Sequence, residues 1–222
     1  MSNAPSLTRG GIIFPIENNQ HIVGLYGFSK DCPPDNESAF FAFAKSLRTN
    51  TIYNAIKDAQ PVTEIKRFIK NESQFLQYNK MKNWPKGFIV VGDSIASFNP
   101  IYGQGITCIV LAMEKLKTQL NSRSTLDSQD CKFIQSKLCN NYRLAWMISQ
   151  NEDLRWPETS GMKTDIVTKM LHKFSDMVAR ASTKDSTVTY AYYFVLHMTK
   201  SPVILLRPDI LLRILIYGSK ST

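Results

Sequence analysis

Two short apolar runs near the start of the chain predict a β-hairpin. Residues 11–16 and 21–27 are dominated by aliphatic and aromatic side chains, and the polar residues 17–20 lie between them. Apolar runs joined by a tight polar turn are typical of two antiparallel strands. Residues 62–69, in which apolar side chains are interspersed with polar ones, predict another strand.

Apolar residues recur at helical spacing through much of the remaining chain. The predicted helices are 36–47, 51–59, 106–120, 131–150, 164–181 and 187–199. Residues 71–86 are polar and predict a connecting loop or a short helix, and the apolar run 203–217 is broken by Pro208. This order predicts an α+β fold, with part of a mixed sheet between residues 11 and 93 and then a mostly helical half.

A further predicted strand, residues 87–93, leads to the most informative chemistry of the chain. Four consecutive apolar residues precede Gly92 and Asp93, which predicts a buried strand with a carboxylate at its C-terminal end. Ligands of α/β folds usually bind at this edge of the sheet. A carboxylate there is suited to accept a hydrogen bond from a sugar or polyol hydroxyl.

A turn that contains glycine leads from this strand into the predicted helix 106–120. Gly103 and Gly105 flank Gln104 at the mouth of the helix, where glycines allow a ligand to approach the backbone closely. The first N–H groups of a helix lack intrahelical partners and suit an anion or an electron-rich carbonyl. The segment fits a ligand with hydroxyls near one end and a polarised group near the other, but the same pattern also occurs in turns with no ligand.

This stretch resembles the second flavin fingerprint of the FAD-dependent aromatic hydroxylase-like superfamily. In that fingerprint Gly-Asp is followed by Pro-x-x-Gly-x-Gly and a helix, which here correspond to Gly92-Asp93 and to Pro100 through Gly105. The run from Phe98 to Gly105 is especially similar to a subgroup of FAD-dependent monooxygenase-like proteins. Softer similarity extends through residues 11–16, the Pro33-Pro34 loop and residues 153–158.

The resemblance implies a set of residues that would hold FAD on its ribityl and isoalloxazine side. These residues are Gly92, Asp93, Pro100, Gly103, Gln104, Gly105 and Ile106. By the resemblance, the Asp93 carboxylate would accept a hydrogen bond from the ribityl chain. The N–H groups around Gly105 and Ile106 would face the pyrimidine side of the ring, and Pro100 would lie beside it.

The same resemblance implies flavin-dependent oxidation, with NAD(P)H as the reductant of the complete enzyme. The expected reaction is monooxygenation of an apolar or aromatic small molecule, and reduction of isoprenoid chains is the alternative within the superfamily. Many hydroxylases of the superfamily have His after Gly-Asp-Ala-Ala, whereas residues 94–97 of this chain contain no His. This departure puts the aromatic hydroxylase mechanism in doubt, and no catalytic residue is assigned.

The first flavin fingerprint of the superfamily, a G-x-G-x-x-G turn after a strand, has no counterpart in the 222 residues. Gly10 and Gly11 are adjacent, Gly24 and Gly27 lie in a predicted strand, and Gly105 is not followed by a glycine at the required spacing. We therefore expect the C-terminal part of a flavoenzyme, without the segment that holds the adenine end of FAD. The isolated chain is then expected to bind FAD poorly and to be inactive.

Three segments follow from this interpretation. Residues 1–86 would form the substrate-side sheet with its connecting helices, 87–122 the second FAD motif, and 123–222 a helical C-terminal region. The rival hypothesis is a non-catalytic remnant. A variant of it is one half of a split flavoenzyme that works with a complementing N-terminal FAD-binding chain.

Composition and charge narrow the class of protein further. The net charge is +9, but Lys and Arg are scattered along the chain and no nucleic-acid module is recognisable, so a solvated basic surface is expected and nucleic acid is not. The four cysteines show no C-x-x-C pair and no Cys/His spacing typical of a metal site, which predicts free thiols in a reducing compartment. We therefore expect a cytoplasmic protein without a metal.

Two further segments leave alternatives open. The apolar run 203–217, with Arg207 and Arg213, is suited to lie on a membrane surface or to pack over the flavin domain as a closing helix, and packing is favoured. The charged residues around Trp156 and Pro157 are interpreted as a salt-bridged surface turn rather than as the lining of a pocket.

Overall fold

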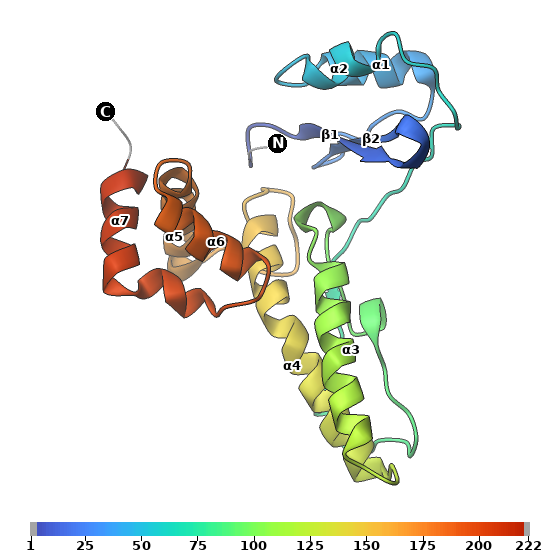
Figure 1. Ribbon diagram of the computed structural model, residues 1–222, viewed down its shortest axis with the longest axis vertical. Helices are drawn as coiled ribbons and strands as arrows, with labels where there is room; N and C mark the ends of the chain where they lie inside the picture. Colours follow the sequence, from blue (N-terminus) through green and yellow to red (C-terminus); the bar gives the residue numbers. More distant parts are fainter. Residues whose placement is uncertain (1–3, 220–222) are drawn as a thin grey trace. The chain divides into compact units, whose positions relative to one another are not determined.

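A computed structural model of the protein describes residues 4–219 (Figure 1). Within these residues the chain is α+β, as the sequence predicts, with seven α-helices and two antiparallel sheets of two strands each. The chain divides into two compact units. One comprises the residues up to Ile69 together with Arg155–Met162, and the other comprises Lys70–Leu154 together with the residues from Lys163 onward.

The predicted hairpin is confirmed and forms the centre of the first unit. Strand β1 (Arg9–Ile16) pairs with β2 (Gln20–Gly27), and the 3-10 turn η1 (Glu17–Asn19) joins them. The predicted helices follow as α1 (Glu37–Lys45) and α2 (Thr51–Ile56).

Helices α1 and α2 cover one face of this hairpin. The Arg9 guanidinium lies 4.4 Å from the centre of the Phe43 ring and forms an ion pair of 2.8 Å with Asp31. On the return segment of the same unit, the Trp156 ring stacks on Phe28 at 4.6 Å, and Glu158 accepts a hydrogen bond from Ser29. Residues around Trp156 therefore hold the end of β2.

The second unit is built on two long helices, α3 (Gly105–Asn121) and α4 (Ser128–Asp153), which lie side by side in Figure 1. Both confirm predicted helices. Their shared core also receives the extended segment before α3. The buried residues of this core are Trp84, Val90, Ile95, Ala96, Phe98, Cys108, Ala112, Cys131, Ile134, Leu138, Cys139, Tyr142 and Ala145.

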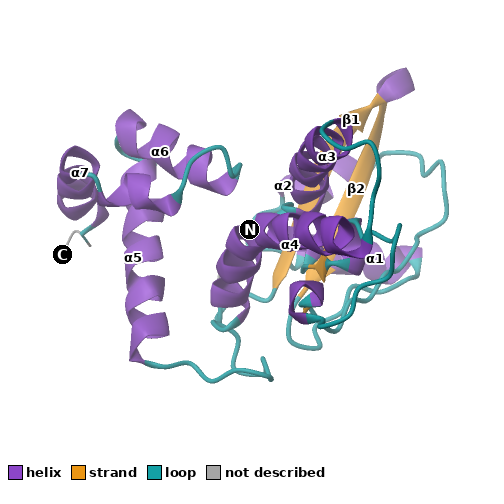
Figure 2. Ribbon diagram, turned by 90° about the horizontal axis from the view of Figure 1, so that it is seen from below, coloured by secondary structure: helices purple, strands orange, loops and turns teal. Residues whose placement is uncertain are grey.

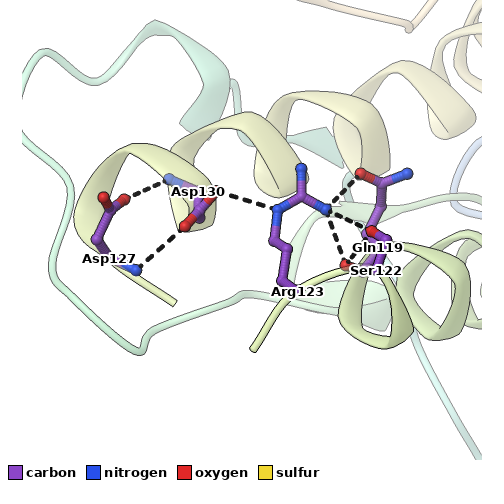
Figure 3. Close-up of polar contacts among 5 residues, drawn as sticks. All are labelled: Gln119, Ser122, Arg123, Asp127 and Asp130. Carbon is purple, nitrogen blue, oxygen red and sulfur yellow. Dashed lines mark hydrogen bonds and ion pairs between the residues drawn. The ribbon is translucent and has the colours of Figure 1, made fainter. Parts of the chain in front are cut away.

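A polar network fixes the turn between α3 and α4 (Figure 3). The Arg123 guanidinium donates to the Gln119 carbonyl at 2.8 Å and to Asp130 at 3.0 Å, which joins the end of one helix to the start of the next. Asp127 caps α4 by accepting from the Asp130 N–H at 2.8 Å, and Asp130 accepts in return from the Asp127 N–H. This capping box satisfies backbone donors that a helix start otherwise leaves unpaired.

Three further helices form a bundle in the same unit. They are α5 (Ile166–Ser182), α6 (Ser186–Leu196) and α7 (Pro208–Gly218), with the 3-10 segment η5 (Pro202–Leu206) before the last. The helices predicted at 164–181 and 187–199 are confirmed. The run 203–217 packs through Ile210 and Ile214 into the core of this bundle, against α5 and α6. None of the helices among residues 4–219 is both long and apolar enough to cross a membrane.

Two strand predictions are wrong. Residues 62–69 form no strand, and Phe68 is 78% exposed. Residues 87–93 form no strand either: Gly87 lies in a turn with a φ of +71°, and residues 88–91 pair with no strand. No mixed sheet is present among residues 4–219, and the second small antiparallel sheet joins β3 (Gln74–Phe75) to β4 (Ala96–Ser97). A strand needs a neighbouring strand to pair with its backbone hydrogen-bonding groups. Here the Val90 N–H donates instead to the Gln135 side chain of α4.

Candidate functional site

The site begins where the extended segment reaches Gly92 and Asp93. These residues open a short 3-10 turn, η3 (Gly92–Ser94), which packs against α3. Gly92 has a φ of +64°, in the left-handed region that favours glycine. The Asp93 side chain is exposed, and its charge contributes to raised pKa values of Cys108 and Tyr142. The carboxylate therefore lies beside the first turns of α3 and is open to solvent.

A second 3-10 turn, η4 (Pro100–Tyr102), brings the chain to the start of α3. The Asn99 side chain accepts from the Ile101 N–H at 3.2 Å, and the Gly103 N–H donates to the Pro100 carbonyl at 3.0 Å. Gly103 has a φ of +68°, which a residue with a side chain adopts only at a cost. The predicted glycine turn is therefore present, and Gly103 is the residue whose backbone requires glycine.

The start of α3 lacks the aspartate cap that begins α4, α5 and α6, a feature that it shares with α7. Asp127, Asp165 and Asp185 cap α4, α5 and α6 with their carboxylates, whereas Gln104 at the start of α3 makes no side-chain cap. The first N–H groups of α3 therefore have neither an intrahelical partner nor a capping side chain.

The space around this helix start is open. A Cβ atom placed on Gly103 or Gly105 meets no other atom within 4 Å. The side chain of Ile106 is 78% exposed, and that of Pro100 is also exposed. A flat ligand has room beside these backbone donors.

A layer of hydrogen bonds behind the turn holds it in place. The buried Gln104 side chain accepts through its Oε1 from the Ser149 hydroxyl at 3.2 Å. The Tyr102 hydroxyl donates to the Asp153 Oδ1 at 2.7 Å, and the Ser73 hydroxyl donates to the other oxygen of that carboxylate at 3.3 Å. The Asp153 carboxylate therefore helps to hold the turn in place through these hydrogen bonds.

Three buried polar residues of α4 form a row that the sequence did not reveal. Gln135, Tyr142 and Ser149 are all fully buried and are separated by seven residues, so they lie on one side of the helix two turns apart. The Gln135 Oε1 accepts from the Val90 N–H at 2.8 Å. The signal was present in the sequence as polar residues at a seven-residue spacing, but such a row is indistinguishable from a solvated face without the partner segment.

The middle member of this row lies next to the Gly92 turn. Burial raises the pKa of the Tyr142 phenol to about 12, and the charge of Asp93 adds to the rise. The Gly92 backbone lowers the pKa of this phenol, so the Tyr142 hydroxyl lies near Gly92. Among residues 4–219 the hydroxyl nevertheless has no partner within hydrogen-bonding geometry. Burial likewise raises the pKa of the Cys108 thiol to about 11, with a contribution from Asp93.

The structure thus brings the seven residues singled out from the sequence into one segment at the start of α3. Asp93 lies beside α3, Pro100 and Gly103 form the turn, and Gly105 and Ile106 begin the helix. Gln104 differs from the others because its side chain points into the protein interior, toward Ser149. Among residues 4–219, no three His, Cys, Asp or Glu side chains gather in a way that would hold a metal ion.

Comparison with known proteins adds one relative. No protein-family model matches the chain. Over 109 residues, which are 49% of this chain, the sequence is 28% identical to Protein Rv3254 of Mycobacterium tuberculosis (strain ATCC 25618 / H37Rv). The aligned part is 23% of that protein, so the chain matches less than a quarter of the length of this curated relative.

Proposed function

We propose that this chain supplies the ribityl and isoalloxazine side of an FAD site and is the C-terminal portion of an FAD-dependent oxidoreductase. The observation that supports this most is the uncapped start of α3, open at Gly105 and placed beside the exposed Asp93 carboxylate. The parent activity we propose is monooxygenation of an apolar or aromatic molecule, with NAD(P)H as reductant. When bound, the flavin supplies the redox chemistry, while the protein positions and tunes it.

The residues present fit the flavin that the fingerprint implies. Asp93 is a hydrogen-bond acceptor for a ribityl hydroxyl, and it stays available because its side chain is exposed. The N–H groups at Gly105 and Ile106 and the positive end of the α3 dipole favour an electron-rich oxygen or a negative charge. The absence of a side chain at Gly105 leaves room for the edge of a ring.

A specific observation also favours a complementing chain segment. Apolar side chains of the fingerprint region are exposed although the sequence predicts a buried strand there: Phe88 is 52% exposed and Val91 40%. In α3, which follows the fingerprint turn, Val110 is 55% exposed. These side chains suit the neighbouring strands that a complete dinucleotide-binding sheet would provide. The second candidate function is therefore half of a split flavoenzyme, which binds its N-terminal partner over this surface.

A flavin-binding experiment tests the proposal. The purified chain should be colourless or nearly so, and titration with FMN should quench the flavin fluorescence saturably but only at high FMN concentration. Asp93→Ala should weaken this binding, whereas Asp58→Ala, which removes an exposed carboxylate of the first unit, should not. Saturable binding that both variants retain, or no binding at any attainable FMN concentration, would argue against a flavin site at Asp93.

A further inference from the structure

The first half of α5 exposes an apolar stripe that the rest of the bundle leaves uncovered. Ile166, Val167, Met170 and Leu171 are 77%, 62%, 65% and 48% exposed. Their spacing places all four on one side of the helix. Figure 2 shows this half of α5 extending beyond α6 and α7, which gather at the other end of the helix.

The second half of α5 continues the same stripe, which is buried or partly buried there. Phe174, Met177, Val178 and Ala181 continue it along α5, and there they pack against α6 and α7. Gly218 of α7 lies so close to the Met177 carbonyl that a Cβ at this position would collide with it. Apolar contact therefore stabilises the second half, while the first half presents the same kind of surface to solvent.

One polar side chain in the first half of α5 contacts the rest of the unit. The His172 Nε2 lies 2.6 Å from the Asn151 carbonyl oxygen of α4, and just before α5 the Thr164 hydroxyl donates to the Leu154 carbonyl. An ordinary surface helix has the opposite arrangement, with its apolar side on the core. In its first two turns α5 turns its apolar stripe away from the unit to which it belongs.

Lysines flank this stripe. Lys163, Lys169 and Lys173 are exposed, and within the part of the chain that the structure describes they form no ion pair. Arg207, just before α7, and Arg213, within it, are each paired with an aspartate. Three exposed lysines without an ion pair therefore lie along or next to the exposed stripe, together with the Asp165 carboxylate that caps α5, and these lysines complement an anionic surface.

We propose that the first half of α5 docks on an anionic membrane surface, with Ile166, Val167, Met170 and Leu171 inserted at the lipid boundary. An amphipathic helix with an apolar face and flanking lysines lies in the plane of the interface and does not span the bilayer. Each lysine near an anionic surface contributes attraction that salt screens. The proposal is independent of the flavin site and shifts membrane contact from the run 203–217 to α5.

Co-sedimentation of the full chain with vesicles tests this docking. Vesicles of phosphatidylcholine with phosphatidylserine should bind the chain at low salt, and vesicles of phosphatidylcholine alone should bind it much less. Lys169→Ala with Lys173→Ala should reduce the affinity about twenty- to thirty-fold, at about 1 kcal/mol per lysine. Ile166→Ser with Met170→Ser should also reduce binding, because it removes exposed apolar surface from the stripe.

The matched control is Leu212→Ser with Leu215→Ser on α7. These side chains are 59% and 52% exposed, so the variant removes exposed apolar side chains from the same bundle, beside arginines that are already paired. Binding should be unchanged in this variant, and circular dichroism should show all variants to be equally helical. No binding to phosphatidylserine vesicles at low salt would overturn the proposal.

Two further outcomes would also overturn it. An equal loss of binding in the α7 variant would place the contact elsewhere on the bundle. Gel filtration that shows a dimer, dissociated by Ile166→Ser with Met170→Ser and without vesicle binding, would assign the stripe to a second copy of the chain.

Discussion

Gly103 and Gly105 are equivalent in the sequence pattern, but the structure gives each a different reason to be glycine. Both have open space where a side chain would lie. Gly103 has a positive φ, so its reason is the backbone of the turn. Gly105 is already helical, so folding does not require glycine there, and its reason is the space that it leaves beside the helix start.

These reasons predict opposite effects of alanine. Gly103→Ala should destabilise the protein by about 1 to 2 kcal/mol, because the left-handed conformation is costly for a residue with a Cβ. Gly105→Ala should leave the free energy of unfolding unchanged or raise it by up to about 1 kcal/mol, because alanine favours a helix. Urea denaturation measures both. Gly105→Ala should also weaken FMN binding, because the added methyl group would occupy the space proposed for the flavin. Full FMN binding by this variant would show that the position assigned to Gly105 is wrong.

The buried thiol of Cys108 predicts a loss of stability at alkaline pH. Its pKa rises from 9.0 to about 11 in the folded chain, so the folded state keeps the proton that the unfolded state loses first. This contribution is complete below pH 9.0 and is lost as the pH rises through about 11, at a cost of about 2 to 3 kcal/mol. Tyr142, whose pKa rises from 10.0 to about 12, adds a further loss above pH 10.

Urea denaturation at a series of alkaline pH values measures this effect. Cys108→Ala should flatten the first part of the pH dependence, while Cys32→Ala, which removes an exposed thiol, should leave it as in the unmodified chain. An unchanged slope in Cys108→Ala would show that the thiol is not the group that titrates.

At the scale of elements, α4 holds the fingerprint segment through its buried polar row. Gln135→Leu should destabilise the protein by about 1 to 3 kcal/mol, because it leaves the Val90 N–H without its acceptor. Tyr142→Phe should be neutral or slightly stabilising, because the hydroxyl that it removes has no partner in the described chain. Thermal unfolding of the two variants distinguishes these effects. A larger loss in Tyr142→Phe than in Gln135→Leu would show that the hydroxyl, and not the amide, holds the segment.

The α3–α4 turn gives a second prediction at this scale. Asp127→Ala should cost about 1 kcal/mol, because the carboxylate caps the first turn of α4. Asp127→Asn keeps an acceptor oxygen and should recover most of that loss. Equal destabilisation by both substitutions would mean that the charge of Asp127 matters more than its hydrogen bond.

The elements that could be predicted from the sequence are those decided by local pattern. The hairpin at β1 and β2 and the helices α1 to α6 follow from apolar spacing, turn residues and caps, all of which act within a few residues. Residues 62–69 and 87–93 were mispredicted as strands because strand formation depends on a neighbour that local pattern does not contain. The Gln104–Ser149 contact and the α4 row were missed for the same reason, since their partners lie 45 residues apart in the chain.

At the scale of the whole molecule, we propose half of a cofactor site. We propose that the ribityl chain and the ring would be held around Asp93 and the start of α3. A G-x-G-x-x-G turn for the pyrophosphate is absent from the sequence. Adenosine should then contribute nothing to the binding of FAD by this chain.

Equilibrium dialysis of the chain against FAD and against FMN, measured in parallel, tests this most directly. We predict weak binding of both flavins, with dissociation constants that agree within about threefold, a difference of less than about 1 kcal/mol. Binding of FAD a hundredfold or more tighter than FMN, about 2.7 kcal/mol, would show that the chain also recognises the adenosine end. Either that result or a stoichiometric yellow flavin in the chain as purified would contradict the half-site.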